Sequence, residues 1–315
     1  MKKFYQICGY IAALAVLLLA VGKVSNNFSQ AKVVDAKASK TTRTNSYKAV
    51  VTTTKKGKIK KTYAVPQFNR IKLACYRPDV VVDLGKKFKI TVIGEKGADV
   101  NKIKTEVTNN QLTVYDEPEY KFNDGDYQIN ITVPHKNSIK ELTGFNYEYG
   151  VIVDKLNIPS INLSSTAGSL FISDVKANNV TFAVKNYDAK QNHDEDNECI
   201  DVFDSKLKSS NFKVSKGNIY IYSSKLKTNT FINHGNFNFG SSKAIGQSTI
   251  DLNTGNFSMF DMFDLPKINC DLTTDSTQKI KVGKKYYSHH FSTPSQTNPL
   301  LKVTSRTGKI SISKD

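Results

Sequence analysis

The chain has 315 residues, and its 45 Lys and Arg residues against 28 Asp and Glu residues give a formal net charge of +17 at pH 7. Asn, Thr, Ser and β-branched residues abound, whereas long runs of Ala, Leu and Glu are missing after residue 22. This composition excludes a mainly helical protein and predicts an all-β fold. The positive charge favours anionic partners but says nothing about the fold.

The N-terminus carries a candidate membrane segment. After Lys2 and Lys3, an apolar run extends from Phe4 to Gly22 and is broken only by Gln6. Its length is close to the roughly 20 residues that cross a bilayer, and the same pattern also fits a secretory signal. We interpret residues 1–22 as a transmembrane anchor or signal and favour the uncleaved anchor, with the rest of the chain outside the cell. Cleavage would instead give a secreted protein.

Residues 23–63 are strongly basic. They contain eleven Lys and Arg residues against the single acid Asp35, so their net charge is eleven minus one, or +10. A segment this polar predicts a disordered stalk. Its lysines could bind an anionic cell-wall polymer or membrane surface, or the stalk could be a solvated spacer. Nucleic acid is not expected, because no aromatic residues are interleaved with the charge. The candidate polyanion-binding residues are Lys55, Lys56, Lys58, Lys60 and Lys61.

The first part of residues 64–315 predicts antiparallel or mixed strands. Residues 80–84 form an apolar run, and residues 88–93 and 127–133 alternate between apolar and polar types. Turn residues separate these runs, including the pair Asn109-Asn110. We expect these strands to cap the first edge of the structure that follows.

A repeat then organises the chain. The sequence Gly217-Asn218-Ile-Tyr-Ile returns as Gly235-Asn236-Phe-Asn-Phe and Gly255-Asn256-Phe-Ser-Met, at spacings of 18 and 20 residues. Weaker copies begin at Gly150, Gly168, Cys199 and Gly308. A second apolar strand precedes most copies, which predicts stacked coils with two short strands each and an amide ladder of Asn218, Asn236 and Asn256. The fold class predicted is therefore a β-solenoid of β-helix type, and the alternative is a β-sandwich with Gly-Asn hairpin turns.

Two features interrupt the repeat. Residues 193–198 are His-Asp-Glu-Asp-Asn-Glu, an acidic insertion that fits a solvated loop better than a Ca²⁺ site because it lacks the spacing of known calcium loops. Residues 275–300 are a basic and aromatic excursion, which could bind a partner or cover the last coil. The candidate residues there are Lys284, Lys285, Tyr286, Tyr287, His289 and His290.

The sequence contains no recognised catalytic or metal-binding motif. No G-x-S-x-G, HExxH or phosphate-binding loop occurs, and the five histidines lack metal-ligand spacing. We therefore predict no catalytic residue, no metal site and no cofactor. Cys75, Cys199 and Cys270 allow one disulfide at most, although burial as small apolar residues is the favoured reading.

The chain resembles a family of bacterial "putative adhesin" β-strand-repeat domains of unknown function. The resemblance rests on residues 68–73, the strand pair at residues 80–84 and 88–93, the strand at residues 129–134 and the glycine-led coils. It covers roughly residues 64–315 and implies a right-handed, single-stranded β-solenoid on the cell surface, without catalytic residues.

These observations lead to three functional hypotheses. The first is a non-enzymatic binding or adhesion module that is anchored in the bacterial membrane. The second is an envelope-stress sensing or regulatory accessory that acts through a membrane protein partner. The third, and least favoured, is an enzyme that acts on wall glycans.

Overall fold

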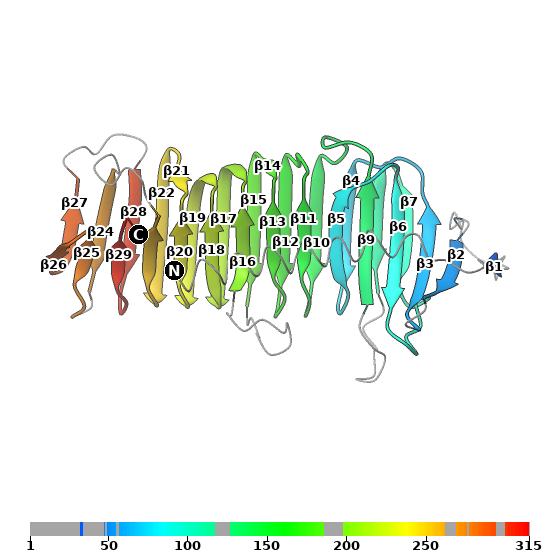
Figure 1. Cartoon of the computed structure of the whole chain (residues 1–315), viewed down its shortest axis with the longest axis horizontal. Helices are drawn as coiled ribbons and strands as arrows, with labels where there is room; N and C mark the ends of the chain where they lie inside the picture. The colour runs from blue at the N-terminus through cyan, green and yellow to red at the C-terminus, as the bar shows by residue number, and fades with distance from the viewer. Residues whose placement is uncertain are drawn as a thin grey trace.

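A computed structural model describes residues 32–33, 47, 49–54, 57–116, 127–185, 198–261, 269–275, 277–293 and 300–314. Every regular element in these ranges is a β-strand, so the all-β class is confirmed (Figure 1). In the same ranges there is no helix with the length and apolar character needed to cross a membrane. The predicted anchor, residues 1–22, lies outside the described residues.

The strands form two large sheets that face each other along the length of the molecule (Figure 1). We call the 15-stranded sheet A and the 14-stranded sheet B. From residue 141 to residue 260 the chain crosses from one sheet to the other and back, and each main strand pairs in parallel with its equivalent from the preceding coil. One circuit of the chain therefore adds one strand to each sheet.

The strands of the coils match the predicted strand pairs. Sheet A takes β11 (Val151–Asp154), β13 (Leu170–Ser173), β16 (Glu198–Phe203), β18 (Asn218–Tyr222), β20 (Phe237–Gly240), β23 (Phe257–Phe260) and β29 (Ile310–Ile312). Sheet B takes β10 (Glu141–Asn146), β12 (Ser160–Ser165), β15 (Asn179–Val184), β17 (Lys206–Lys216), β19 (Lys225–His234), β22 (Gln247–Thr254) and β28 (Leu300–Ser305). The short strands β14 (Lys176–Ala177) and β21 (Lys243–Ala244) pair with the first residues of β17 and β19.

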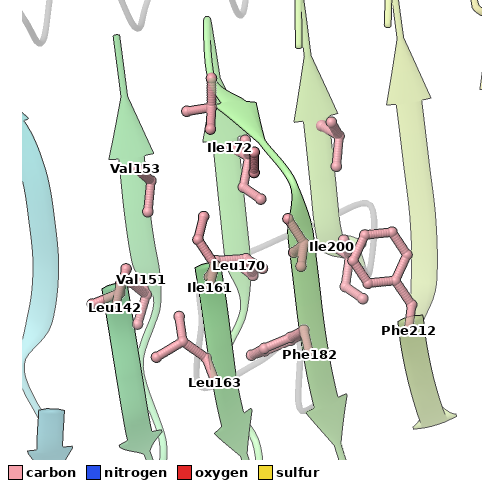
Figure 2. Close-up of a cluster of buried hydrophobic side chains, with 14 of the residues drawn as sticks. Leu142, Val151, Val153, Ile161, Leu163, Leu170, Ile172, Phe182, Ile200 and Phe212 are labelled. Carbon is pink, nitrogen blue, oxygen red and sulfur yellow. The ribbon is translucent and has the colours of Figure 1, made fainter. Parts of the chain in front are cut away.

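The core lies between the two sheets. Alternate residues of each strand point inward, so that one apolar position stacks on the same position of the next coil (Figure 2). In sheet A one such row runs Val151, Leu170, Ile200, Ile219, Phe237 and Phe257, each 2% exposed or less. Burying a side chain of this size stabilises the fold by about 1.5–3 kcal/mol. The stability of the stack therefore comes from many such contacts between neighbouring coils.

A glycine and an asparagine build one corner in three successive coils. The N–H and the side-chain amide of Asn236 donate to Asn218 Oδ1 at 2.8 and 3.1 Å, and those of Asn256 donate to Asn236 Oδ1 at 2.9 and 3.1 Å. Asn256 Oδ1 accepts from the N–H of Lys309 at 2.8 Å, which extends the amide ladder to the next coil. Gly217, Gly235 and Gly255 precede these asparagines with φ values of +135, +146 and +143°.

The N-terminal end of the stack mixes parallel and antiparallel pairs. In sheet A, β5 (Asp79–Leu84) pairs with β9 (Tyr127–Val133), followed by β6 (Lys89–Gly94), β3 (Ile59–Ala64), β2 (Ala49–Thr53) and β1 (Lys32–Val33). In sheet B, β4 (Arg70–Cys75) is followed by β8 (Gln111–Tyr115) and β7 (Lys104–Thr108). The strands at residues 79–84 and 89–94 are therefore not neighbours, because β9 lies between them. The pairs β5–β9 and β4–β8 are parallel, and the strands beyond them pair antiparallel.

The prediction of a disordered stalk is wrong for the end of that segment. Residues 49–53 and 59–64 are strands of sheet A rather than a flexible chain. Tyr63 is 8% exposed and pairs with Ile90, so the segment contributes to the core despite its lysines. The long aliphatic stems of Lys60 and Lys61 let these residues occupy a strand between β2 and β6 while their ammonium groups reach water.

The C-terminal end does not follow chain order. Strand β28 lies between β22 and β24 (Cys270–Thr274), and β29 lies between β23 and β25 (Ile280–Val282). Strands β26 (Lys285–Tyr287) and β27 (His290–Ser292) then pair antiparallel with β25 and β24. The last coil in the sequence is thus enclosed by the excursion that precedes it, at the left of Figure 1.

Candidate functional site

The corner opposite the Gly-Asn ladder is built on serine. In three successive coils, the residue after the sheet A strand takes a positive φ: Asp204 (+46°), Ser223 (+50°) and Ser241 (+46°). A buried serine follows, and its hydroxyl oxygen accepts an N–H from the preceding coil: Ser205 N–H donates to Ser224 Oγ at 3.0 Å, and Ser224 N–H donates to Ser242 Oγ at 3.0 Å. This serine ladder fixes the spacing of the coils at the corner.

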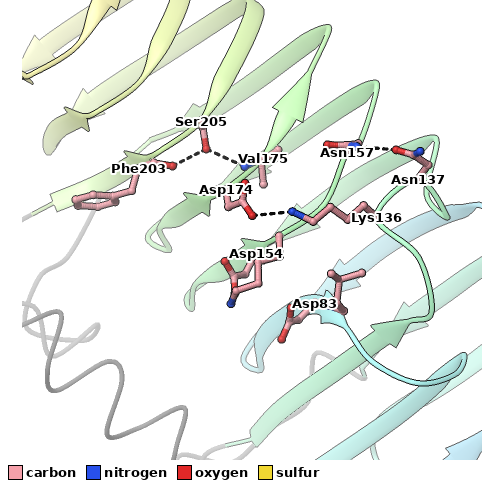
Figure 3. Close-up of polar contacts among 11 residues, drawn as sticks. Asp83, Lys136, Asn137, Asp154, Asn157, Asp174, Val175, Phe203 and Ser205 are labelled. Atoms are coloured by element: carbon pink, nitrogen blue, oxygen red, sulfur yellow. Dashed lines mark hydrogen bonds and ion pairs between the residues drawn. The ribbon is translucent and has the colours of Figure 1, made fainter.

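The serine ladder has one further rung toward the N-terminus. Ser205 Oγ donates to the carbonyl of Phe203 at 2.6 Å and accepts the N–H of Val175 at 3.0 Å (Figure 3). The bonded coils therefore run from residue 175 to residue 242. Because each buried hydroxyl has both a donor and an acceptor partner, the corner is rigid.

A lysine comes directly after this corner in four successive coils. Lys176 pairs with Lys206, Lys206 with Lys225 and Lys225 with Lys243 in the register of neighbouring parallel strands. All four side chains are exposed, while the residue after each points inward, as Leu207 and Leu226 do with 0% exposure. We call Lys176, Lys206, Lys225 and Lys243 the lysine ladder. Lys208 and Lys227 are also exposed, two residues beyond the second and third rungs.

The lysine ladder places like charges side by side. Neighbouring strands are about 4.8 Å apart, and two unit charges at that distance repel by up to about 0.9 kcal/mol in water. Like charges directly opposite in a sheet destabilise it. An anionic polymer that lies along the ladder would relieve this repulsion at every rung, so the arrangement is suited to binding a polyanion rather than to stabilising the fold.

The lysine ladder begins at Lys176, whose neighbour on the other side is an asparagine. In the two coils before Lys176 the same corner carries amides: Asn157 bridges to Lys176, and its side chain donates to Asn137 Oδ1 at 2.6 Å (Figure 3). Asp174, which precedes this rung, pairs with Lys136 at 2.8 Å. The carboxylate nearest to Lys176 in sequence therefore already has a cationic partner.

The lysines predicted as a polyanion site do not converge. Lys55 and Lys56 lie outside the described residues. Lys58 forms an ion pair with Glu95, and Lys61 donates to Asn101 Oδ1 at 2.7 Å and lies 5.1 Å from the centre of the Tyr63 ring. Lys60 is on the opposite face of the same strand, and burial together with the charge of Lys89 lowers its pKa.

The predicted C-terminal loop contains two short strands at the end of the stack, β26 in sheet A and β27 in sheet B, each antiparallel to its neighbour. Tyr287 packs on Phe291 with ring centres 4.6 Å apart, and both partly buried rings rest against the core. His290 Nε2 lies 2.9 Å from Asp271 Oδ1 on sheet B, whereas Tyr286 is 62% exposed. The candidates Lys284, Lys285 and His289 are also exposed. This geometry matches a cover for the last coil, and the six residues do not gather into one patch.

Among the described residues there is neither a disulfide nor a group of metal-ligating side chains. Cys75, Cys199 and Cys270 are buried thiols, none of them in a disulfide. Burial raises the pKa of the Cys270 thiol to about 12, so it stays protonated near neutral pH. In this part of the chain no three His, Cys, Asp or Glu side chains are grouped to hold a metal ion. The acidic insertion before Glu198 falls outside it.

The lysine ladder was not found from the sequence, although a signal exists. Ser205-Lys206-Leu207, Ser224-Lys225-Leu226 and Ser242-Lys243-Ala244 repeat at 19 and 18 residues, close to the spacing of the glycines. Each coil contributes only one lysine to the ladder, which therefore forms no contiguous run of charge in the sequence.

Comparison with known proteins confirms the predicted resemblance. Residues 67–187 match the family described as "Putative auto-transporter adhesin, head GIN domain", a family of unknown function. No curated protein matches the chain significantly.

Several solved structures are similar to the chain at low identity. A putative adhesin from Parabacteroides merdae is 9% identical, with 82% of this chain and 97% of that chain covered and a TM-score of 0.41. A putative adhesin from Bacteroides fragilis is 15% identical, with coverage of 81% and 96% and a TM-score of 0.37. A putative lipid binding protein from Parabacteroides distasonis is 13% identical, with coverage of 82% and 95% and a TM-score of 0.44. These likenesses are too distant to carry an argument.

Proposed function

We propose, from the match of residues 67–187 to a family of putative auto-transporter adhesins, that this chain is a non-enzymatic binding module displayed on the bacterial cell surface. Its fold is a right-handed, single-stranded β-solenoid with an N-terminal cap of mixed parallel and antiparallel strands. Residues 1–22 anchor the chain in the membrane, and the coils project outward. The chain alternates between two sheets whose strands are mostly parallel, and this alternation supports the solenoid.

The partner we propose is an anionic polymer of the cell envelope, and the lysine ladder carries this proposal. Its four rungs follow the long axis of the stack, so they offer cations at a regular interval of about 4.8 Å. An extended polymer with repeated phosphate or carboxylate groups can engage all rungs together, whereas a small anion can engage only one or two. Exposed lysines keep such binding reversible and sensitive to salt.

The test compares two triple variants of the full-length chain that have the same net charge. The ladder variant changes Lys206, Lys225 and Lys243 to Gln. The control variant changes three exposed lysines outside the ladder to Gln: Lys72, Lys213 and Lys309. Binding to purified cell wall and to inorganic polyphosphate is measured across a salt series, and circular dichroism confirms that each variant is folded.

The ladder variant should bind about 100-fold more weakly, since each lysine near an anionic surface contributes about 1 kcal/mol. Its affinity should also depend less steeply on salt than that of the wild type. Equal losses in the two variants would show that net charge alone governs binding and would contradict the proposed site. Recovery of a signalling membrane protein in place of wall polymer would favour the regulatory hypothesis instead.

A further inference from the structure

The outward face of sheet A carries a row of aromatic side chains that the lysine ladder does not use. They occur on strands β13, β16, β18 and β23, at positions that alternate with the buried core residues. All five rings are partly exposed. We call them the aromatic row: Phe171, Phe203, Tyr220, Tyr222 and Phe260.

The rings contact one another across the strands. Phe171 and Phe203 stack with ring centres 5.5 Å apart and an interplanar angle of 30°, and Tyr220 and Tyr222 stack at 6.2 Å and 7°. Phe203 lies 5.7 Å from Tyr220, and Tyr220 lies 6.1 Å from Phe260. The row is therefore one continuous aromatic surface rather than a set of isolated rings.

A glycine keeps this surface continuous. Gly240 lies between Tyr222 and Phe260 in the register of the sheet. A Cβ atom there would be 2.6 Å from a ring carbon of Phe260 and 2.7 Å from one of Tyr222, so the two rings cover the space that a side chain would need. Polar residues share the outward face with the rings. In the neighbouring row, successive strands carry Asp201, Tyr220, Asn238 and Ser258.

The aromatic row and the lysine ladder flank the same corner of the same coils. Phe203 is three residues before Lys206, and Tyr222 is three residues before Lys225. In both coils the residues between them are the positive-φ residue and the buried serine of the corner. Both rows follow the axis of the stack, so one extended polymer can run beside both of them.

We propose that the aromatic row binds the sugar rings of the same polymer, which makes the ligand an anionic polysaccharide. This inference rests on the proposed polyanion function of the lysine ladder. One face of a pyranose ring presents C–H groups and packs flat on an aromatic ring, while its hydroxyls bond to neighbouring polar groups. A surface of packed rings, with Asn238 and Ser258 beside it on the outward face, offers both contacts, whereas the lysine ladder alone does not distinguish a polysaccharide from any other polyanion.

The experiment separates sugar recognition from charge recognition with two probes. Polygalacturonate carries carboxylates on sugar rings, and inorganic polyphosphate carries charge without sugar. The aromatic variant of the full-length chain changes Phe203 and Tyr222 to Leu, which keeps apolar bulk but removes the rings. The control is Phe231→Leu, because Phe231 is 43% exposed on the outward face of sheet B, away from this corner.

The aromatic variant should bind polygalacturonate about tenfold more weakly than the wild type and bind polyphosphate equally well, and Phe231→Leu should change neither affinity. Unchanged binding of polygalacturonate, or equal losses for both probes, would overturn the inference. The ladder variant tests the proposed function separately: it should lose polyphosphate binding, and if it does not, the polyanion proposal fails whatever the aromatic variant does. Thermal melting checks that each variant has kept its fold.

Discussion

Gly235→Ala should destabilise the stack more than any change in an exposed side chain. Gly235 has a φ of +146°, a conformation that an L-residue adopts only under strain of about 1–3 kcal/mol. A Cβ atom there would also lie 2.7 Å from the carbonyl carbon of Gly217, with the carbonyl oxygen closer still. Relief requires the corner to open, which weakens the bond from Gly235 N–H to the Thr254 carbonyl (2.9 Å). Adding about 1–3 kcal/mol for overpacking to this strain, we expect a loss of about 2–6 kcal/mol in the free energy of unfolding.

Gly97→Ala is the matched control for Gly235→Ala. Gly97 also has a positive φ, +92°, but a Cβ atom there would have nothing within 4 Å. This variant therefore shows the backbone strain alone, about 1–2 kcal/mol. Urea unfolding of the full-length variants, followed by circular dichroism, measures both losses. If the two variants lost the same stability within about 0.5 kcal/mol, the reasoning about stacked glycine corners would be refuted.

Three further changes test the polar contacts of the fold. Asn236→Ala removes the acceptor for the N–H and the side-chain amide of Asn256. Urea unfolding should show a loss of about 1–3 kcal/mol, and no loss would mean that the amide ladder does not stabilise the fold. Ser224→Ala leaves the buried N–H of Ser205 without its acceptor, and the same assay should show a similar loss together with faster hydrogen exchange at that corner. Burial raises the pKa of Asp116 to about 6, so the fold favours its protonated carboxyl. The stability that this protonated group contributes is fully present below pH 4 and is lost as pH rises through 6. Between pH 4 and pH 6 the wild type should lose about 2 kcal/mol of its free energy of unfolding, a loss that Asp116→Asn should not show. Parallel pH profiles of the two proteins would contradict this assignment.

Much of the fold could be predicted because its corners need unusual residues. The Gly-Asn pairs at residues 217, 235 and 255 combine a positive φ with an amide that bonds to the next coil, and few other residues satisfy both conditions. Their spacing therefore revealed the length of one coil. The strands between them followed from the alternation of apolar residues.

The two ends of the stack could not be predicted in the same way. The order of β28 and β29 depends on which edge the chain returns to, and no local pattern in residues 300–312 records that choice. At the N-terminal end, lysines concealed the strand at residues 59–64, because a strand can carry charged residues whose long stems let the ammonium groups reach water. Ile59 and Tyr63 were the only large apolar residues that marked it.

The candidate site was missed for a related reason. A ladder brings together residues that are 18–30 positions apart, such as Lys176, Lys206, Lys225 and Lys243, so its charge is dispersed in the sequence and concentrated in space. The aromatic row is dispersed in the same way. Once the register of the coils is known, both follow from the residue that each coil places at one position.

Chemical footprinting of lysines tests the central claim most directly. The acetylation rate of each lysine in the full-length chain is measured by mass spectrometry, with and without purified anionic wall polymer. The account predicts that Lys176, Lys206, Lys225 and Lys243 become protected together, while Lys72 and Lys213 react as before. Uniform protection of all exposed lysines, or protection confined to residues 55–61, would contradict it.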